Sequence, residues 1–412
     1  MAISSIKMEK TGPLCDVKVL EMCHVMAGPT CGRMLADMGA DVIKLERVPG
    51  GDDTRYMLPP AIDGEPAAFM MMNCNKRGIA IDLKNKRGKD VFKSIIKKID
   101  ILTENYRSDT MTKLGLGYNE LKVINPGLIY CSISGFGRTG PYATRGGYDL
   151  IAQGMSGLMS ITGEGPDRPP VKLGGPVCDI TAGILAAMGV LAAYVNRLKT
   201  GQGQVVDTSL FEAGITHTYW QSAIALATGV APEPMGSAHP LNGPYQAVET
   251  SDGWITFSGA NNSNWERLTK LIARPELVHD PRFQDNEGRM SNMKELMKIL
   301  STEFKKKSRE QWLQALEAAK IPAGPILNIK EMHADPQTLE RNMVVEVQHD
   351  RIGPIKTIGC PVKFSNTPSA VHAAAPIYGQ HTREVLSEFG YSAGEIKDLI
   401  NDGIVITNEP AD

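Results

Sequence analysis

The feature that most constrains the fold is a succession of apolar, amphipathic and apolar segments near the N-terminus. Val17–Cys23 is a short apolar run, 30–38 is amphipathic, and Asp41–Glu46 is apolar again. Alternation of this kind is typical of a strand, a helix and a second strand. Because parallel strands need a long crossover connection, usually a helix, the three segments predict a βαβ unit.

The same alternation returns further along the chain. Apolar residues within 91–99 recur at helical spacing, and strands are expected at 101–104 and 128–133. Residues 180–198 predict a long apolar helix, with a strand at 204–208 behind it. Strands that alternate with helices indicate an α/β domain built on a parallel sheet.

A segment crowded with helix breakers, 229–244, predicts a crossing into a second, smaller α+β domain. In that domain we expect a strand at 254–257 and helices at 264–273, 291–306 and 309–319. The last stretch, with helices at 382–389 and 394–401, is too short to fold alone. The predicted boundaries are therefore 1–228 for the N-terminal part of the large domain, 229–336 for the small domain, and 337–412 for the C-terminal segment that completes the large domain.

Charge and cysteine content restrict the partners and the compartment. The 412 residues include 44 Lys and Arg against 46 Asp and Glu, so no global field attracts nucleic acid or an anionic membrane. No window approaches the roughly 18 uninterrupted apolar residues of a membrane span. Seven widely spaced cysteines form no C-x-x-C pair, so neither disulfides nor a metal site is predicted. We expect a cytoplasmic protein with no bound metal.

Several motifs of common enzyme classes are missing from the sequence. There is no phosphate loop of the form G-x-x-x-x-G-K-[ST], no G-x-S-x-G elbow and no H-E-x-x-H pair. Gly201 and Gly203 precede a strand, which is the reverse of the dinucleotide-binding context. His24 follows an apolar strand and is interpreted as a strand-end residue without a catalytic role.

Asp179 precedes the predicted long helix, and its local pattern has two interpretations. A carboxylate at a helix start caps the free N–H groups of the first turn, which is a structural role. The helix dipole also favours its ionised form, and Gly174-Gly175 before it permits close approach of a ligand. Local rules favour the cap, although capping and catalysis are compatible.

A series of ordered motifs carries a resemblance that covers about residues 14–405. They include Ala27-Gly-Pro-Thr-Cys-Gly-Arg33, Gly51-Asp-Asp-Thr-Arg55, Ser134-Gly-Phe-Gly-Arg-Thr-Gly-Pro141, Gly147-Tyr-Asp149 and Lys199-Thr-Gly-Gln-Gly203. In these motifs the chain resembles the family III CoA-transferases. The resemblance implies a Rossmann-like large domain, the small domain inserted in it, and two chains interlocked as a ring-like homodimer.

The resemblance also implies a reaction in which Asp179 is the covalent nucleophile. CoA would pass from a donor acyl-CoA, such as succinyl-CoA, to a small carboxylic, dicarboxylic or hydroxy acid through an aspartyl anhydride and an aspartyl-CoA thioester. A carboxylate that is ionised near neutral pH can attack a thioester without a partner base. CoA and acyl-CoA are substrates here, and no permanently bound cofactor is expected.

Similarity to the formyl-CoA:oxalate branch implies which residues contact CoA: Val25, Met26, Ala27, Arg47, Ile81, Lys84, Asn105, Tyr106, Lys113, Gly146, Gly147 and Tyr148. A loop over the nucleophile matches Gly259, Ala260 and Asn261, although an ordinary turn explains the same residues. Met26, Lys113 and Gly146 differ from that branch, which argues against formyl-CoA and oxalate as substrates.

Two alternatives stay open. The α-methylacyl-CoA racemases share the fold and pair an aspartate matching Asp179 with a histidine, where this chain has Tyr148. A phenol with a pKa near 10 is a poor base for α-proton abstraction. The other alternative is a non-catalytic protein that binds CoA without turnover, against which the retained Asp179 argues.

Overall fold

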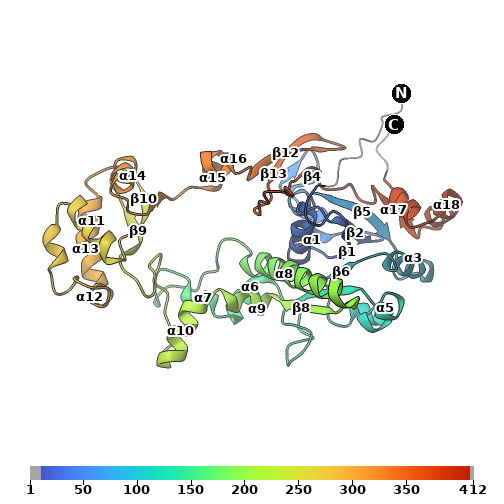
Figure 1. The fold of residues 1–412 in the computed structure, drawn as a ribbon, viewed down its shortest axis with the longest axis horizontal. Coiled ribbons are helices and arrows are strands. Elements are labelled where there is room, and N and C mark those ends of the chain that lie inside the picture. Colours follow the sequence, from blue (N-terminus) through green and yellow to red (C-terminus); the bar gives the residue numbers. More distant parts are fainter. Residues whose placement is uncertain (1–10, 409–412) are drawn as a thin grey trace. The chain divides into compact units, whose positions relative to one another are not determined.

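A computed structural model describes residues 11–408, which divide into two compact units (Figure 1). The first unit contains residues 11–156, Gly174–His217 and 336–408. The second contains Gly157–Leu173 and Thr218–Asp335. The second unit thus includes 157–173 and 218–228, which the predicted boundaries assign to the large domain.

A seven-stranded sheet organises the first unit, in the order β14-β5-β2-β1-β6-β7-β8. Neighbouring strands are parallel except for β14, which runs antiparallel to β5 at the edge. The strands are β1 (Lys18–Met22), β2 (Asp41–Arg47), β5 (Lys76–Ile81), β6 (Ile101–Glu104), β7 (Ile129–Ser134), β8 (Val205–Ser209) and β14 (Val405–Ile406).

Helices cover both faces of this sheet (Figure 1). One face carries α1 (Ala27–Asp37) and α8 (Val177–Thr200), which pack against each other. The other face is covered by four helices: α3 (Lys86–Ile96), α5 (Tyr118–Ile124), α17 (Thr382–Glu388) and α18 (Ala393–Asn401). Their buried apolar side chains, such as Phe92, Leu121 and Leu386, form one core with the sheet. The C-terminal segment therefore completes the core that the N-terminal part begins.

Shorter elements fill the connections of the first unit. They are η1 (Asp53–Tyr56), β3 (Ala61–Ile62), β4 (Glu65–Pro66), α2 (Ala67–Met72), α4 (Thr110–Leu114), α6 (Asp149–Met155), α9 (Leu210–Thr216), α16 (Pro336–Glu340), β12 (Val344–His349) and β13 (Gly353–Ile358).

The second unit is built around the antiparallel sheet β11-β10-β9. Its core joins sheet residues such as Phe257 to helix residues such as Trp265 and Phe304, all buried. The elements are α7 (Leu158–Ile161), α10 (Tyr219–Thr228), β9 (Tyr245–Glu249), β10 (Trp254–Ser258), α11 (Asn262–Leu271), η2 (Pro275–Val278), α12 (Asn286–Ser291), α13 (Met293–Phe304), α14 (Arg309–Ala318), β11 (Ala323–Pro325) and α15 (Ile329–Ala334).

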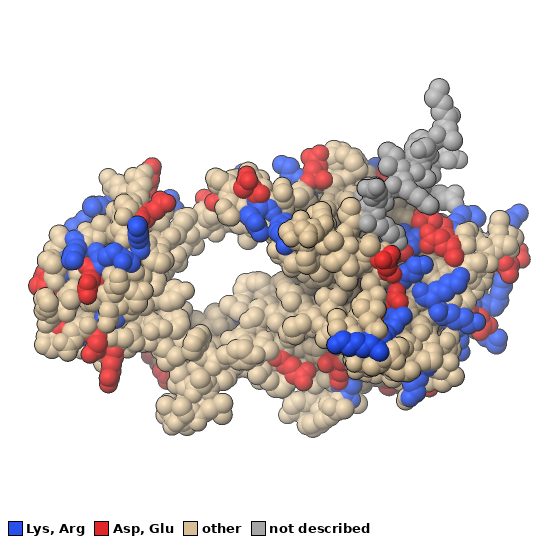
Figure 2. All heavy atoms as spheres, viewed as in Figure 1, with Lys and Arg blue, Asp and Glu red and all other residues tan. Residues whose placement is uncertain are grey.

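Helix α8 is long and apolar, with a mean hydropathy of 1.8 over its most apolar window. By length and composition it could cross a membrane, but a single helix of this kind is weak evidence for a membrane protein. Its buried residues, such as Ala182, Ala186 and Val190, pack inside the first unit. Figure 2 shows basic and acidic side chains interspersed on each unit, in keeping with the balanced composition.

Candidate functional site

A pocket of about 330 Å³ lies in the first unit, at the carboxyl ends of the parallel strands. Residues that follow β1, β6, β7 and β8 line it, together with Arg47 at the end of β2. From β1 the chain adds β2 and β5 on one side of the sheet, and from β6 it adds β7 and β8 on the other side. The strand order therefore reverses between β1 and β6, which makes this place a topological switch point. In open α/β sheets, ligands bind in the crevice at this place.

Most residues that the sequence predicts at a CoA site line this pocket. Asp179 from α8 lies among them. The predicted residues in the lining are Val25, Met26, Ala27, Arg47, Asn105, Tyr106, Gly146, Gly147, Tyr148 and Asp179. The fold thus gathers segments that are far apart in the sequence.

Three predicted residues lie elsewhere. Ile81 is fully buried in β5, where it pairs with Val405 of β14, so its side chain belongs to the core. Lys84 is exposed beyond the end of β5. Lys113 is exposed on α4 and forms an ion pair with Asp109 one turn earlier. None of the three is among the described residues that line the pocket.

The predicted loop at Gly259, Ala260 and Asn261 belongs to the second unit, where hydrogen bonds fix it as the turn between β10 and α11. The Asn261 side chain caps α11 by accepting from the N–H of Asn264 at 2.7 Å. The Ala260 carbonyl accepts from the buried guanidinium of Arg289 at 2.9 Å. These contacts are those of an ordinary helix-capping turn.

Asp179 lies in the first turn of α8, not before the helix. The helix begins at Val177, and the residue at the N-cap is Pro176, which makes no side-chain capping hydrogen bond. The interpretation of Asp179 as the N-cap is therefore wrong, because the helix starts earlier than the apolar pattern indicates. Gly183, one turn later, lets α8 approach α1: a Cβ there would lie 2.5 Å from the Ala27 carbonyl oxygen.

The environment of Asp179 favours its protonated form. Burial and, secondarily, the negative charge of Asp149 raise the pKa of Asp179 to about 7. The expectation that the helix start keeps this carboxylate ionised is corrected accordingly, because burial away from water disfavours the charged form. The raised pKa reduces the fraction of molecules that carry the ionised carboxylate near pH 7.

Asp149, the first residue of α6, ties that helix to the start of α8. One carboxylate oxygen accepts from the N–H of Cys178 at 2.9 Å, and the other accepts from the Gln153 amide at 2.6 Å. Both hydrogen bonds hold the carboxylate close to Asp179. Sequence reasoning quoted Asp149 in a motif but gave it no role.

Cationic and aromatic groups complete the pocket. Arg107 and Arg145 are exposed, and the Arg145 guanidinium lies 4.0 Å from the centre of the Tyr142 ring. His24 shares a hydrogen bond of 3.3 Å with the Tyr106 hydroxyl, and burial together with the charge of Lys44 lowers the pKa of His24. His24 is therefore neutral at pH 7.

Sequence reasoning did not assign a substrate contact to several residues of the lining. They are His24, Asp53, Arg107, Ser108, Ile133, Ser134, Gly135, Ala143, Arg145 and Leu210. Many of them follow the end of a strand, and this position is a signal that could have found them.

Known proteins resemble the chain along most of its length. It matches the family described as CoA-transferase family III over residues 14–382. It is 40% identical over 382 residues to a succinate--glutarate CoA-transferase of Agrobacterium fabrum, covering 91% of this chain and 95% of that protein. It is 36% identical over 403 residues to a succinyl-CoA:glutarate CoA-transferase of Homo sapiens, covering 98% and 92%.

A solved structure shows the same architecture. The crystal structure of a CAIB/BAIF family protein from Brucella suis superposes with a TM-score of 0.81 at 37% identity, covering 92% of this chain and 100% of that chain. The mixed α/β fold with its largely parallel sheet is thus shared, and the resemblance seen in the motifs is confirmed. The chain belongs to CoA-transferase family III.

Proposed function

We propose that this protein transfers CoA from an acyl-CoA to a small carboxylate, with Asp179 as the covalent nucleophile. The observation that carries the proposal is the position of Asp179 in the strand-end pocket, beside Gly146, Gly147 and Tyr148. Arg47, Arg107 and Arg145 line the same pocket. They suit the phosphates of CoA, because one guanidinium group can donate two parallel hydrogen bonds to the oxygens of a phosphate.

The reaction proceeds through acyl exchanges that keep the thioester energy. Asp179 attacks the carbonyl of the donor acyl-CoA, so that a mixed anhydride forms and the C–S bond breaks to release CoA thiolate. The thiolate attacks the aspartyl carbonyl, which gives aspartyl-CoA and frees the donor acid. The acceptor carboxylate then attacks the carbonyl of aspartyl-CoA, so that a second anhydride forms and the C–S bond breaks to release CoA thiolate. The thiolate attacks the carbonyl of the acceptor acyl group in this anhydride, releasing the new acyl-CoA and the Asp179 carboxylate.

The raised pKa of Asp179 has two opposing effects on the first step. It reduces the ionised fraction near pH 7, and it makes the ionised carboxylate a better nucleophile, because desolvation weakens its stabilisation by water. Asp149 contributes to both effects through its charge. No proton need move during the exchanges once Asp179 is ionised.

For the substrates we propose succinyl-CoA as the donor and a dicarboxylate such as glutarate as the acceptor. Support comes from the similar proteins named above, which act on succinate or succinyl-CoA and glutarate by name. A protein from Chloroflexus aurantiacus that is 35% identical is named for succinyl-CoA and D-citramalate. Selectivity among such acids rests on a few contacts, each of roughly 1–3 kcal/mol.

The test is an acceptor screen with succinyl-CoA, in which new acyl-CoA species are followed by mass spectrometry. We expect transfer by the wild type and loss of at least ~10³-fold in Asp179→Asn. Asp90→Asn, which changes an exposed carboxylate on α3, is the matched control and keeps full activity. Hydroxylamine added with succinyl-CoA should convert Asp179 to a hydroxamate.

Other outcomes of the screen point to the alternatives. Exchange of an α-proton without a new acyl-CoA would support the racemase, and CoA binding without either reaction would support the non-catalytic protein. Transfer that persists in Asp179→Asn would contradict Asp179 as the nucleophile.

We also propose that the protein is a homodimer in which a second copy covers α8. The helix exposes a row of apolar side chains that includes Ile184, Met188 and Leu198, with Met188 62% exposed. Such exposed apolar surfaces mark interfaces. Light scattering should show a dimer that Met188→Glu dissociates, whereas Val123→Glu, at a residue 78% exposed on α5, leaves it intact. An unchanged mass for Met188→Glu would contradict this interface.

The compartment we propose is the cytoplasm. All seven cysteines are free, and six of them are buried. Free thiols persist in a reducing compartment.

A further inference from the structure

Val25, in the turn between β1 and α1, has a left-handed backbone with a φ of 64°. A β-branched residue rarely adopts this conformation, because its Cβ crowds the following carbonyl oxygen. Val25 also lines the pocket, between His24 and Met26. Strained backbone persists only where surrounding contacts over-determine it, so the contacts of this turn identify what holds it.

Backbone groups on both sides of Val25 are fixed by side chains from other segments. Asn105 accepts from the N–H of His24 at 2.9 Å and donates to its carbonyl at 2.8 Å. Asp52 accepts from the N–H of Val25 at 3.2 Å. Lys44 donates to the carbonyl of Cys23 at 2.9 Å. Three consecutive residues of the turn are thus held by polar side chains.

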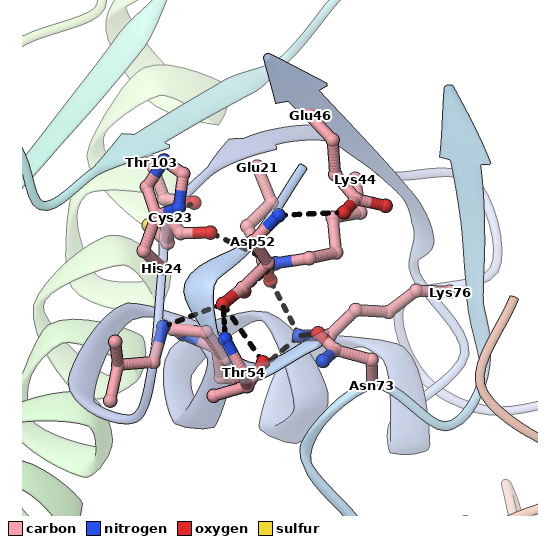
Figure 3. A network of polar contacts seen from close by, with 12 residues as sticks. Glu21, Cys23, His24, Lys44, Glu46, Asp52, Thr54, Asn73, Lys76 and Thr103 are labelled. Atoms are coloured by element: carbon pink, nitrogen blue, oxygen red, sulfur yellow. Dashed lines mark hydrogen bonds and ion pairs between the residues drawn. The ribbon is translucent and has the colours of Figure 1, made fainter. Parts of the chain in front are cut away.

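The two charged groups among these holders form one buried ion pair. The Lys44 ammonium lies 2.9 Å from the second oxygen of Asp52, and both side chains are completely buried (Figure 3). Glu21 lies 3.1 Å from Lys44 on its other side and 2.8 Å from Lys76. Two ammonium groups and two carboxylates give this buried cluster no net charge, and removal of one member would leave a buried charge without its partner.

Asp52 is itself held in place by its own loop. The same oxygen that accepts from Val25 accepts from the N–H and the hydroxyl of Thr54, at 2.9 and 2.8 Å. The N–H of Asp52 donates to Glu46 at 2.9 Å. Arg47, at the end of β2, and Asp53, which follows Asp52, both line the pocket. Asp52 therefore joins two walls of the pocket.

We propose that Asp52 is a positioning residue that, paired with Lys44, holds the strained Val25 turn in the shape that receives the acyl-CoA substrate. The inference rests on the proposed function in that it takes this pocket as the CoA site. Asp52 does not touch the reacting atoms, since its side chain is buried behind the turn. Its loss should weaken CoA binding while the chemistry at Asp179 continues.

The experiment measures the Kd for CoA by calorimetry, and the KM and kcat for the donor acyl-CoA, in Asp52→Ala. We expect both Kd and KM to rise about tenfold, a factor equal to 1.4 kcal/mol, with kcat changed less than about twofold. Asp41→Ala is the matched control, because Asp41 pairs with Arg77 at 2.8 Å at the opposite end of β2. It should leave Kd unchanged.

A rescue separates positioning from a general loss of structure. Val25→Gly removes the steric penalty of the left-handed turn, so Asp52→Ala should raise the Kd less in a Val25→Gly protein than in the wild type. If Asp52→Ala does not fold, Thr54→Val carries the test, because it removes one of the bonds that orient Asp52. We then expect a rise in Kd of about threefold that Val25→Gly again reduces.

Each result bears on one claim. An unchanged Kd for CoA in a folded Asp52 or Thr54 variant would overturn the inference. An equal loss of CoA affinity with and without Val25→Gly would overturn it too. In both cases transfer by the wild type would still support the proposed function. A wild type that binds CoA but transfers none would overturn the proposed function, and the Kd comparison would still decide the inference.

Discussion

The Asp149 carboxylate accepts a hydrogen bond of 2.9 Å from the N–H of Cys178, the residue directly before Asp179. This bond fixes the first turn of α8 against the first residue of α6 and holds two carboxylates as neighbours. Their mutual repulsion adds to burial in raising the pKa of Asp179. Protonation of Asp179 is therefore the property of the site that solution experiments can follow most directly.

The first prediction concerns the pH dependence of the wild type. Under the proposed mechanism only the ionised form of Asp179 attacks the thioester, and the pKa of Asp179 is raised to about 7. Below that value, kcat/KM for the donor acyl-CoA should fall about tenfold per pH unit, and above about pH 8 it should level off. Initial rates between pH 5 and 9 measure this. A flat profile from pH 5 to 8 would contradict the raised pKa.

Asp149→Asn tests the contribution of the second carboxylate. The amide oxygen can still accept from Cys178, so the change removes the charge and the hydrogen bond that the second oxygen accepts from Gln153. We expect the midpoint of the profile to move down by about one pH unit, while burial keeps it above that of an exposed aspartate. Asp207→Asn on β8, whose carboxylate accepts from the N–H of Arg138, serves as the control. Equal midpoints in Asp149→Asn and the wild type would refute the coupling.

Stability should respond to Asp179 with a definite sign. The folded state raises the pKa of this acid, so folding is penalised when pH exceeds the unfolded value of about 4, and the full penalty is reached above pH 7. Asp179→Asn should therefore raise the free energy of unfolding by about 1–2 kcal/mol at pH 8, allowing for partial exposure, and by almost nothing at pH 4. Urea denaturation at the two pH values measures the difference. A variant less stable than the wild type at pH 8 would exclude this account.

Gly183 should tolerate no side chain. Alanine normally stabilises a helix relative to glycine, but a Cβ here would lie 2.5 Å from the Ala27 carbonyl oxygen. We expect Gly183→Ala to cost about 1–3 kcal/mol and to lower activity, since α1 and α8 both contribute to the pocket. Gly394→Ala on α18, where a Cβ meets open space, should instead gain roughly 0.5–1 kcal/mol. Thermal melts of both variants decide it.

Much of the fold follows from apolar periodicity. The first predicted strand, helix and strand correspond to β1, α1 and β2, and the expected strand at 101–104 coincides with β6. Strand β5 was not expected, because it begins with Lys76 and Arg77. Both are paired inside the fold, Lys76 with Glu21 and Arg77 with Asp41. A prediction from local strand propensity counts such charges against a buried strand, because it contains no information about the distant residues that pair with them.

The site divides in a similar way. Motif resemblance indicated Asp179 and the segment Val25–Ala27, which the fold brings to one pocket. It also indicated Ile81, which the edge pairing with β14 buries. The strain at Val25 and the charge effect of Asp149 depend on distances between segments, and no local pattern of residues contains them.

The late position of β14, α17 and α18 in the chain has a consequence for synthesis. A ribosome that has completed Leu210 has made every residue that lines the pocket, yet the β5 edge and the sheet face beneath Val385 and Leu386 still lack their cover. The nascent protein therefore exposes an apolar surface, to which other proteins could bind, while about half of its sequence is still to be synthesised. A chain that ends before α17 would contain every described residue that lines the pocket, but it would lack part of the core that supports the sheet.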